Sequence, residues 1–262
     1  MGLKLQDVPA AAGWRWVMAS FTEYGRHPVA YTGLFVAFML AVFIAMLLPW
    51  IGGILLLLAV PLLSLGFMIG THESVNGRPL HVGVYVLPWR QREPDRRAPL
   101  FALLVVYAVL TAAALWFCEW VDGGAFDAWL TAFAKGDTPP DEVARLAMAP
   151  GTVAGALWRT SLTTLIAVPF WFAPALVFWA GQGPAQALFS STLALWRARL
   201  AFLAYAMGWV AVMLVAGLLA SLLVALLGPS LTGLLVMPLG LVLSAVFYVS
   251  LYISFRDCFG EP

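Results

Sequence analysis

The feature that most constrains this chain is where its charges are missing. Four long stretches contain no Asp, Glu, Lys, Arg or His: 28–71, 98–118, 160–196 and 200–255. A helix needs about 20 mostly apolar residues to cross the ~30 Å hydrocarbon layer of a bilayer. Within that layer a single segment satisfies its own backbone hydrogen bonds only as a helix. The sequence therefore predicts an all-α, polytopic membrane protein.

Six transmembrane helices account for these stretches. Gly and Pro residues divide the first stretch near 49–53 and the last at Gly228-Pro229, as expected for tight turns. With 63% hydrophobic and 10% charged residues, the composition disfavours a soluble enzyme, a disordered chain and a nucleic-acid-binding protein. We expect one membrane domain over 1–262, with transmembrane helices at about 29–49, 51–70, 99–118, 160–181, 201–227 and 230–255.

The basic residues predict the orientation, because cytoplasmic connections are enriched in Lys and Arg. Most of the 14 basic residues fall in the N-terminal segment, the second and fourth connections and the C-terminal tail. The long third connection, 119–159, instead carries six acidic residues. We therefore expect both termini in the cytoplasm and 119–159 as a helical loop on the outer side. Cys118 and Cys258 then lie on opposite sides of the membrane and cannot pair.

Internal similarity indicates three related helical hairpins, each preceded by a segment at the cytoplasmic face. A shift of 171 residues places Ser20 on Ser191 and Arg26 on Arg197, each just before a two-helix apolar stretch. The second helix of each expected hairpin also carries a proline, at Pro61, Pro169 and Pro238. The alternative is that apolar hairpins resemble one another through composition alone.

Two of the cytoplasmic-face segments, within 1–27 and 183–199, have amphipathic patterns. In the first, helical spacing predicts one apolar stripe formed by Trp14, Val17, Met18, Phe21 and Tyr24. Such helices lie in the headgroup plane, or they extend the following spans into the cytoplasm. The loop 119–159 is expected to be a helical cap on the outer leaflet or a surface for a partner, and both readings stay open.

The residues that most membrane chemistry requires are missing from the predicted spans. Proton pumps, ion-coupled carriers and voltage sensors place ionisable side chains at membrane depth, and none of the six predicted spans has one in its core. The three histidines, His27, His72 and His81, fall at the cytoplasmic face, where they cannot ligate a transmembrane haem. No phosphate-binding loop or serine nucleophile motif is present. We therefore expect no enzymatic activity, no cofactor and no metal site.

Two groups of residues remain as candidate sites. Pro169 and Pro174 interrupt the fourth span, and each removes a backbone donor and frees a carbonyl. This break either lines a cavity for a lipid or another ligand, with Trp171, Phe172 and Phe178 as candidate walls, or it only kinks the helix. Arginines at the cytoplasmic boundary are candidate contacts for anionic lipid, or they only set the topology. These arginines are Arg90, Arg92, Arg96, Arg97, Arg197 and Arg199.

Three segments together resemble a family of six-helix proteobacterial inner-membrane proteins. They are 13–28, the stretch 169–177 with 187–190, and 252–260. The resemblance covers nearly the whole chain. It implies the inner membrane of a Gram-negative bacterium, so that 119–159 is periplasmic, and it brings no catalytic residue or ligand.

The function predicted from the sequence is non-enzymatic. We expect an inner-membrane protein that acts by interaction, as an accessory, assembly or scaffold component or as a lipid-contacting module. The alternative is a passive or lipid-type translocator with a central path between the hairpins. The expected partners are membrane lipids, with self-association or another membrane-protein complex as further options, and no nucleic acid.

Overall fold

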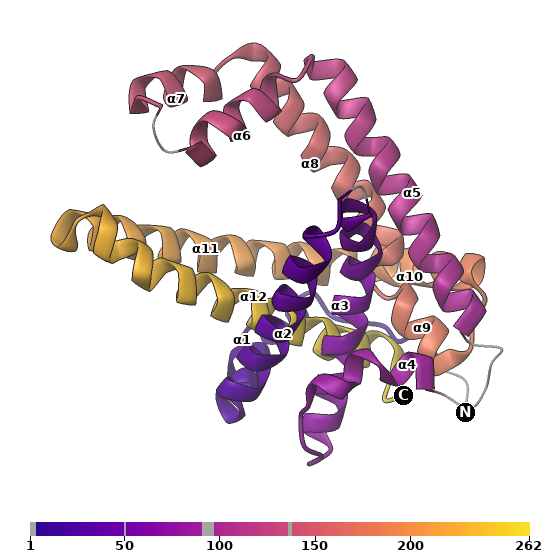
Figure 1. Ribbon diagram of the computed structural model, residues 1–262. Helices are drawn as coiled ribbons and strands as arrows, with labels where there is room; N and C mark the ends of the chain where they lie inside the picture. Colours follow the sequence, from indigo (N-terminus) through magenta and orange to yellow (C-terminus); the bar gives the residue numbers. More distant parts are fainter. Residues whose placement is uncertain (1–3, 50, 91–96, 136–137) are drawn as a thin grey trace.

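The computed structural model describes residues 4–49, 51–90, 97–135 and 138–262. All regular secondary structure in these ranges is helical. Figure 1 shows long helices that share one region of the molecule and extend from it in different directions. The all-α fold predicted from the sequence is confirmed.

Six spans in the described ranges are long and apolar enough to cross a membrane, as predicted. All six overlap the four charge-free stretches of the sequence. The fourth span is formed by two helices in succession, α8 and α9. The helices are α2 (Pro28–Met46), α3 (Gly52–Val75), α5 (Arg97–Asp122), α8 (Pro150–Phe170) with α9 (Ala173–Ala180), α11 (Arg199–Leu227) and α12 (Pro229–Phe259).

The fourth span begins earlier than the sequence suggested. α8 starts at Pro150 rather than near 160, and Arg159 lies inside it. The Arg159 guanidinium is paired with the carboxylates of Asp122 and Asp127. Because an ion pair removes much of the cost of a charge near the membrane, Arg159 does not end the helix.

The spans form three hairpins, α2–α3, α5–α8 and α11–α12. The tip of the second hairpin carries α6 (Ala125–Lys135) and α7 (Pro140–Ala147). A short helical segment precedes each hairpin: α1 (Ala12–Arg26), η1 (Val82–Tyr85) with α4 (Leu87–Arg90), and α10 (Pro184–Arg197). A shift of 171 residues carries the end of α1 onto the end of α10 and the start of α2 onto the start of α11.

The three prolines do not take equivalent places. Pro61 is the tenth residue of α3, and Pro238 is the tenth residue of α12. Pro169 is instead the last but one residue of α8. The difference follows from the earlier start of α8.

The first helix is packed into the bundle. α1 lies against α11 and α12, and a Cβ at Gly13 would overlap the carbonyl oxygen of Ala201. Small residues permit such close helix approach in membranes. Trp16 is fully buried, and its Nε1 donates a hydrogen bond of 2.8 Å to Asp257 Oδ2 on α12.

The buried face of α1 differs from the apolar stripe predicted by spacing. Trp14 and Met18 are 49% and 41% exposed, whereas Ser20 and Glu23 are buried. The buried face of α1 therefore includes small and polar residues, and the predicted stripe is divided: Trp14 and Met18 face outward, Val17 is fully buried, and Phe21 and Tyr24 are partly buried against the core.

Both ends of the chain meet in one region, which we call the terminal end. It comprises α1, the first turn of α2, the last turns of α3 and α12, and α9 with α10. The backbone N–H of Gln6 donates to the carbonyl oxygen of Cys258 at 2.8 Å. The tip of α11–α12 extends away from the α5–α8 hairpin (Figure 1).

The two cysteines are both buried and free. Cys118 lies near the end of α5, and Cys258 lies near the end of α12.

Candidate functional site

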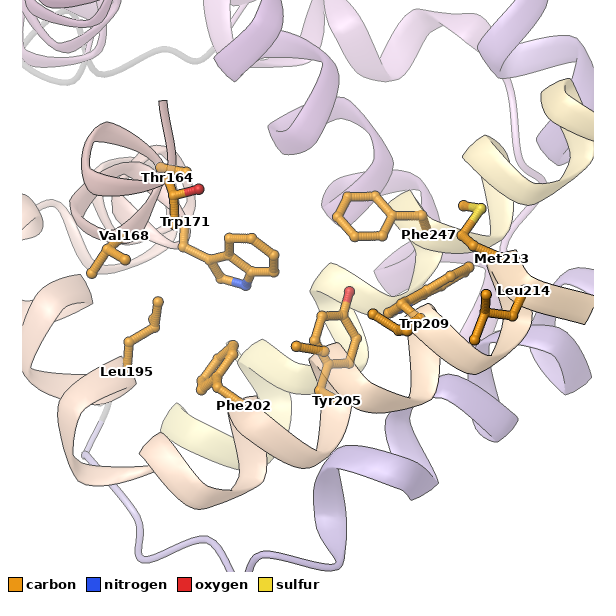
Figure 2. A pocket seen from close by; sticks show the side chains of 13 residues that line it. Thr164, Val168, Trp171, Leu195, Phe202, Tyr205, Trp209, Met213, Leu214 and Phe247 are labelled. Atoms are coloured by element: carbon orange, nitrogen blue, oxygen red, sulfur yellow. The ribbon is translucent and has the colours of Figure 1, made fainter. Parts of the chain in front are cut away.

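The main candidate site is a cavity of about 630 Å³ between the second and third hairpins. Figure 2 shows aromatic rings from both sides directed into it. Few polar groups reach its wall, and one of them, the Tyr205 hydroxyl, already lies 2.7 Å from Ser250 Oγ. The lining residues are Thr164, Ala167, Val168, Trp171, Leu195, Phe202, Tyr205, Ala206, Trp209, Val210, Met213, Leu214 and Phe247.

Trp171 enters the cavity from the break between α8 and α9. Its ring meets Phe202, Tyr205 and Phe247 edge to face, with centroids 5.9, 6.1 and 6.1 Å away. Its Nε1 atom is buried, and no described residue accepts its hydrogen bond. A buried donor without a partner is costly in an apolar environment, and the Nε1 atoms of Trp171 and Trp209, two cavity-lining residues, are both buried without an acceptor among the described residues.

The helix break that positions Trp171 is stabilised by Ser191 on α10. The N–H of Phe172 donates to Ser191 Oγ at 3.0 Å, and the Ser191 hydroxyl lies 3.3 Å from the carbonyl oxygen of Val168. Proline at 169 interrupts the backbone ladder here, and Ser191 supplies partners on both sides of the break. Sequence reasoning did not find this role, although the 171-residue shift had already singled out Ser191.

The other candidate wall residues are distributed differently. Phe172 is fully buried, with its ring 5.6 Å from Phe255, and Phe178 is 6% exposed. Pro174 is buried in α9, and Pro169 is half-buried. Among these five residues, Trp171 lines the cavity, and the others support the break or the core behind it.

A second cavity, of about 250 Å³, lies on the other side of Trp171. It is formed by α3, α5, α8 and α12, with Pro61, Ser64 and Tyr107 in its wall. Trp171 and Phe247 line both cavities. These two rings therefore separate the lateral cavity from a smaller space among the three hairpins.

The arginines at the terminal end differ in their contacts. Arg197 pairs with Asp7 at 2.8 Å. Arg199 is exposed, its guanidinium lies 5.7 Å from the Trp196 ring, and no described carboxylate pairs with it. Since Leu195 and Phe202 both line the cavity, Arg199 lies beside one end of it.

The remaining predicted arginines belong to the connection between α3 and α5. Arg90 is exposed at the end of α4, and Arg97 is the first residue of α5. Arg92 and Arg96 lie outside the described residues.

A buried carboxylate holds the terminal end together. Glu23 of α1 accepts hydrogen bonds from Ser74 Oγ at 2.7 Å and from the Tyr31 hydroxyl at 3.1 Å. Arg26 Nη1 lies 2.9 Å from its other oxygen. The Glu23 side chain is only 7% exposed, so one carboxylate joins α1, α2 and α3. Glu23 lies outside the apolar stripe predicted for α1, and the sequence alone did not indicate its burial.

Tyr85 fastens the connection after α3 to the bundle. Its hydroxyl donates to the carbonyl oxygen of Leu34 at 3.2 Å. Burial raises the pKa of Tyr85 well above its ordinary value, so the hydroxyl stays protonated and remains a donor. The absence of a side chain at Gly66 makes room for the Tyr85 ring.

At the tip of the second hairpin, Asp122 and Arg159 form a largely buried ion pair. Asp122 Oδ1 also accepts the N–H of Gly124 at 2.8 Å, and the Arg159 guanidinium lies 4.4 Å from the Phe126 ring. A Cβ at Gly155 would overlap the Asp122 carboxylate. These contacts fix the start of the α6–α7 loop. Across the described ranges, no group of three or more His, Cys, Asp or Glu side chains is placed to hold a metal ion.

Comparison with known proteins places the chain in a family. No family model matches the sequence, and no solved structure matches the fold. A probable inner membrane protein of Burkholderia thailandensis is 31% identical over 263 residues, which cover 99% of this chain and 96% of that protein. The six spans confirmed above agree with the six-helix family suggested by the sequence. The chain therefore belongs to the same family of proteobacterial inner-membrane proteins as its Burkholderia relative.

Proposed function

We propose that this protein is a non-enzymatic lipid-binding module of the bacterial inner membrane. The observation that carries the proposal is the cavity of about 630 Å³ between α8 and α11, with its almost wholly apolar wall. The module acts alone, in self-association, or as an accessory or scaffold component of another membrane-protein complex.

The dimensions and surface of the cavity suit an acyl chain. Its volume falls within the range typical of small-molecule sites, and an apolar space does not hold ordered water. From Phe202 to Leu214 the α11 wall is about 18 Å long at 1.5 Å per residue. One leaflet of hydrocarbon is about 15 Å deep, so the cavity matches the length of a lipid tail.

The cavity is also open to the side from which a lipid would enter. Val210, Met213 and Leu214 line it and are 49%, 52% and 64% exposed. These side chains lie on a membrane span, where the surrounding medium is lipid. A tail can therefore enter sideways without crossing the protein core.

A photoactivatable lipid tests the proposal directly. A phospholipid with a diazirine on one acyl chain is incorporated with the protein into bilayer nanodiscs, and labelled peptides are mapped by mass spectrometry. We expect enrichment at the cavity wall, at Trp171 and Met213. Ala206→Trp, which fills the cavity, should remove this enrichment, whereas Leu203→Trp should not, because Leu203 is 59% exposed on α11 outside the lining. Uniform labelling of all spans would contradict the proposal.

We also propose that the terminal end faces the cytoplasm. Most basic residues of the chain lie in segments that belong to this end or adjoin it, and positive charge is retained on the cytoplasmic side. The loop with α6 and α7 then lies in the periplasm. Fusion of alkaline phosphatase to the C-terminus should give an inactive enzyme, and fusion of green fluorescent protein should give a fluorescent one. The reverse result would overturn this orientation.

A lipid-type translocator is the second candidate. The observation in its favour is the smaller cavity behind Trp171 and Phe247, which together with the lateral cavity would form a path between the hairpins. Vesicles containing the protein and a fluorescent lipid in both leaflets distinguish the two roles. Faster dithionite quenching of the inner-leaflet lipid than in protein-free vesicles would support translocation, and equal quenching favours binding alone.

A further inference from the structure

We propose that the cavity selects an anionic phospholipid, whose phosphate lies at Arg199 and whose ester carbonyl accepts a hydrogen bond from Trp171 Nε1. This inference rests on the proposed lipid-binding function. It adds the chemical class of the ligand and the two residues that recognise it.

The charge beside the cavity favours an anionic ligand. Arg199 lies at the end of the cavity where α10 meets α11, at the start of a membrane span. The neighbouring Arg197 is paired with Asp7, whereas no described carboxylate pairs with Arg199. The guanidinium of Arg199 therefore retains its positive charge for a phosphate, which it can bind through two parallel hydrogen bonds.

The position of Trp171 along α11 fits the layout of a phospholipid. Phe202 and Tyr205 lie about 4.5 and 9 Å along α11 from Arg199. The Trp171 ring is 5.9 Å from Phe202 and 6.1 Å from Tyr205. The indole therefore lies one to two helical turns farther along α11 than Arg199. In a glycerophospholipid the ester carbonyls likewise lie just below the phosphate, at the top of the acyl chains.

The indole of Trp171 carries an unpaired hydrogen-bond donor. Trp171 Nε1 is buried and has no acceptor among the described residues, although the ring points into the cavity (Figure 2). Hydrocarbon offers no acceptor, but an ester carbonyl does. A bound phospholipid would satisfy this donor while its tail fills the apolar space beyond it.

A competition experiment tests whether the cavity prefers anionic lipid. The diazirine phospholipid described above is used here as a phosphatidylcholine. Unlabelled phosphatidylglycerol and phosphatidylcholine with identical acyl chains are compared as competitors. We expect phosphatidylglycerol to compete about fivefold better, the effect of one arginine near an anionic surface. Arg199→Gln should abolish this preference and Arg199→Lys should retain most of it. Arg145→Gln, at the α7 end of the molecule, should leave the preference unchanged.

A second set of variants tests the Trp171 hydrogen bond separately from the charge of Arg199. Trp171→Phe keeps an aromatic ring and removes the donor, so both lipids should compete about threefold less well, with the preference for phosphatidylglycerol preserved. Trp116→Phe is the matched control, because Trp116 is 71% exposed on α5. An unchanged affinity in Trp171→Phe would overturn the assignment of the ester contact.

Failure of this inference and failure of lipid binding give different results. If the cavity binds lipid without selecting its headgroup, the probe labels the cavity wall, and both lipids compete equally in the wild type and in Arg199→Gln. If the cavity does not bind lipid, the probe does not label its wall in any variant.

Discussion

The terminal end and the far half of α11–α12 differ in how their side chains are packed. At the terminal end, small residues bring helices close together and polar side chains satisfy one another, as Glu23 does with Ser74 and Tyr31. Along the far half of α11, large apolar side chains such as Leu218 and Leu222 are 71% and 55% exposed. In a bilayer, apolar surface gains little by leaving lipid for protein, so close packing and hydrogen bonds hold helices together. The terminal end therefore carries the stability of the fold, and the α11–α12 tip offers surface to the membrane.

The largest effect is expected where the packing is closest. Gly13→Leu places a side chain where α1 meets the backbone of α11 at Ala201. Overpacking against backbone costs about 3 kcal/mol or more, so little folded protein should be recovered by size-exclusion chromatography in detergent. Gly25→Ala in the same helix has open space around its Cβ and should behave as the wild type. Equal recovery of the two variants would refute the close α1–α11 contact.

The next effect on stability is expected at the buried carboxylate of Glu23. Glu23→Leu leaves the donors of Ser74 and Tyr31 without their acceptor, which should lower the free energy of unfolding by about 2 kcal/mol. A decrease in the midpoint of thermal unfolding in detergent measures this effect. Glu142→Leu is the control, because its carboxylate is 45% exposed in an exposed ion pair. If both variants unfold at the same temperature, Glu23 does not link the three helices.

The smallest effect is expected on the α11–α12 tip. Leu218→Ala should change the free energy of unfolding by less than about 0.5 kcal/mol, because the side chain is 71% exposed. Leu176→Ala, at a fully buried leucine in α9, should cost about 3 kcal/mol. Thermal unfolding of the pair in the same detergent provides the measurement. A large loss in Leu218→Ala would indicate that a second chain covers the tip.

The spans were predictable because the membrane imposes one strong rule, that charges are excluded over about 20 residues. The rule misplaced the start of α8 because Arg159 is neutralised by Asp122, 37 residues away in the sequence. No local pattern reports such a distant partner.

Which side chains pack inside the bundle was harder to predict from the sequence. Spacing marked an apolar stripe on α1, but it could not separate Val17, which is buried against other helices, from Trp14 and Met18, which are exposed. Trp171 could be identified because the neighbouring prolines drew attention to it. Tyr205, Trp209 and Phe247 occupy uniformly apolar spans, so only the arrangement of the helices brings them together around the cavity.

The contact of α1 with α11 and α12 has a consequence for the order of assembly. Ribosomes make α1 before these two partners, so α1 is without these neighbours while the intervening spans are synthesised. Contacts between such distant parts of a chain form slowly, because a long loop must close before they stabilise the fold. Until α11 and α12 are inserted, the part of α1 that packs on them, including Gly13 and Trp16, has no complete binding site. α1 therefore reaches its native place long after its own synthesis.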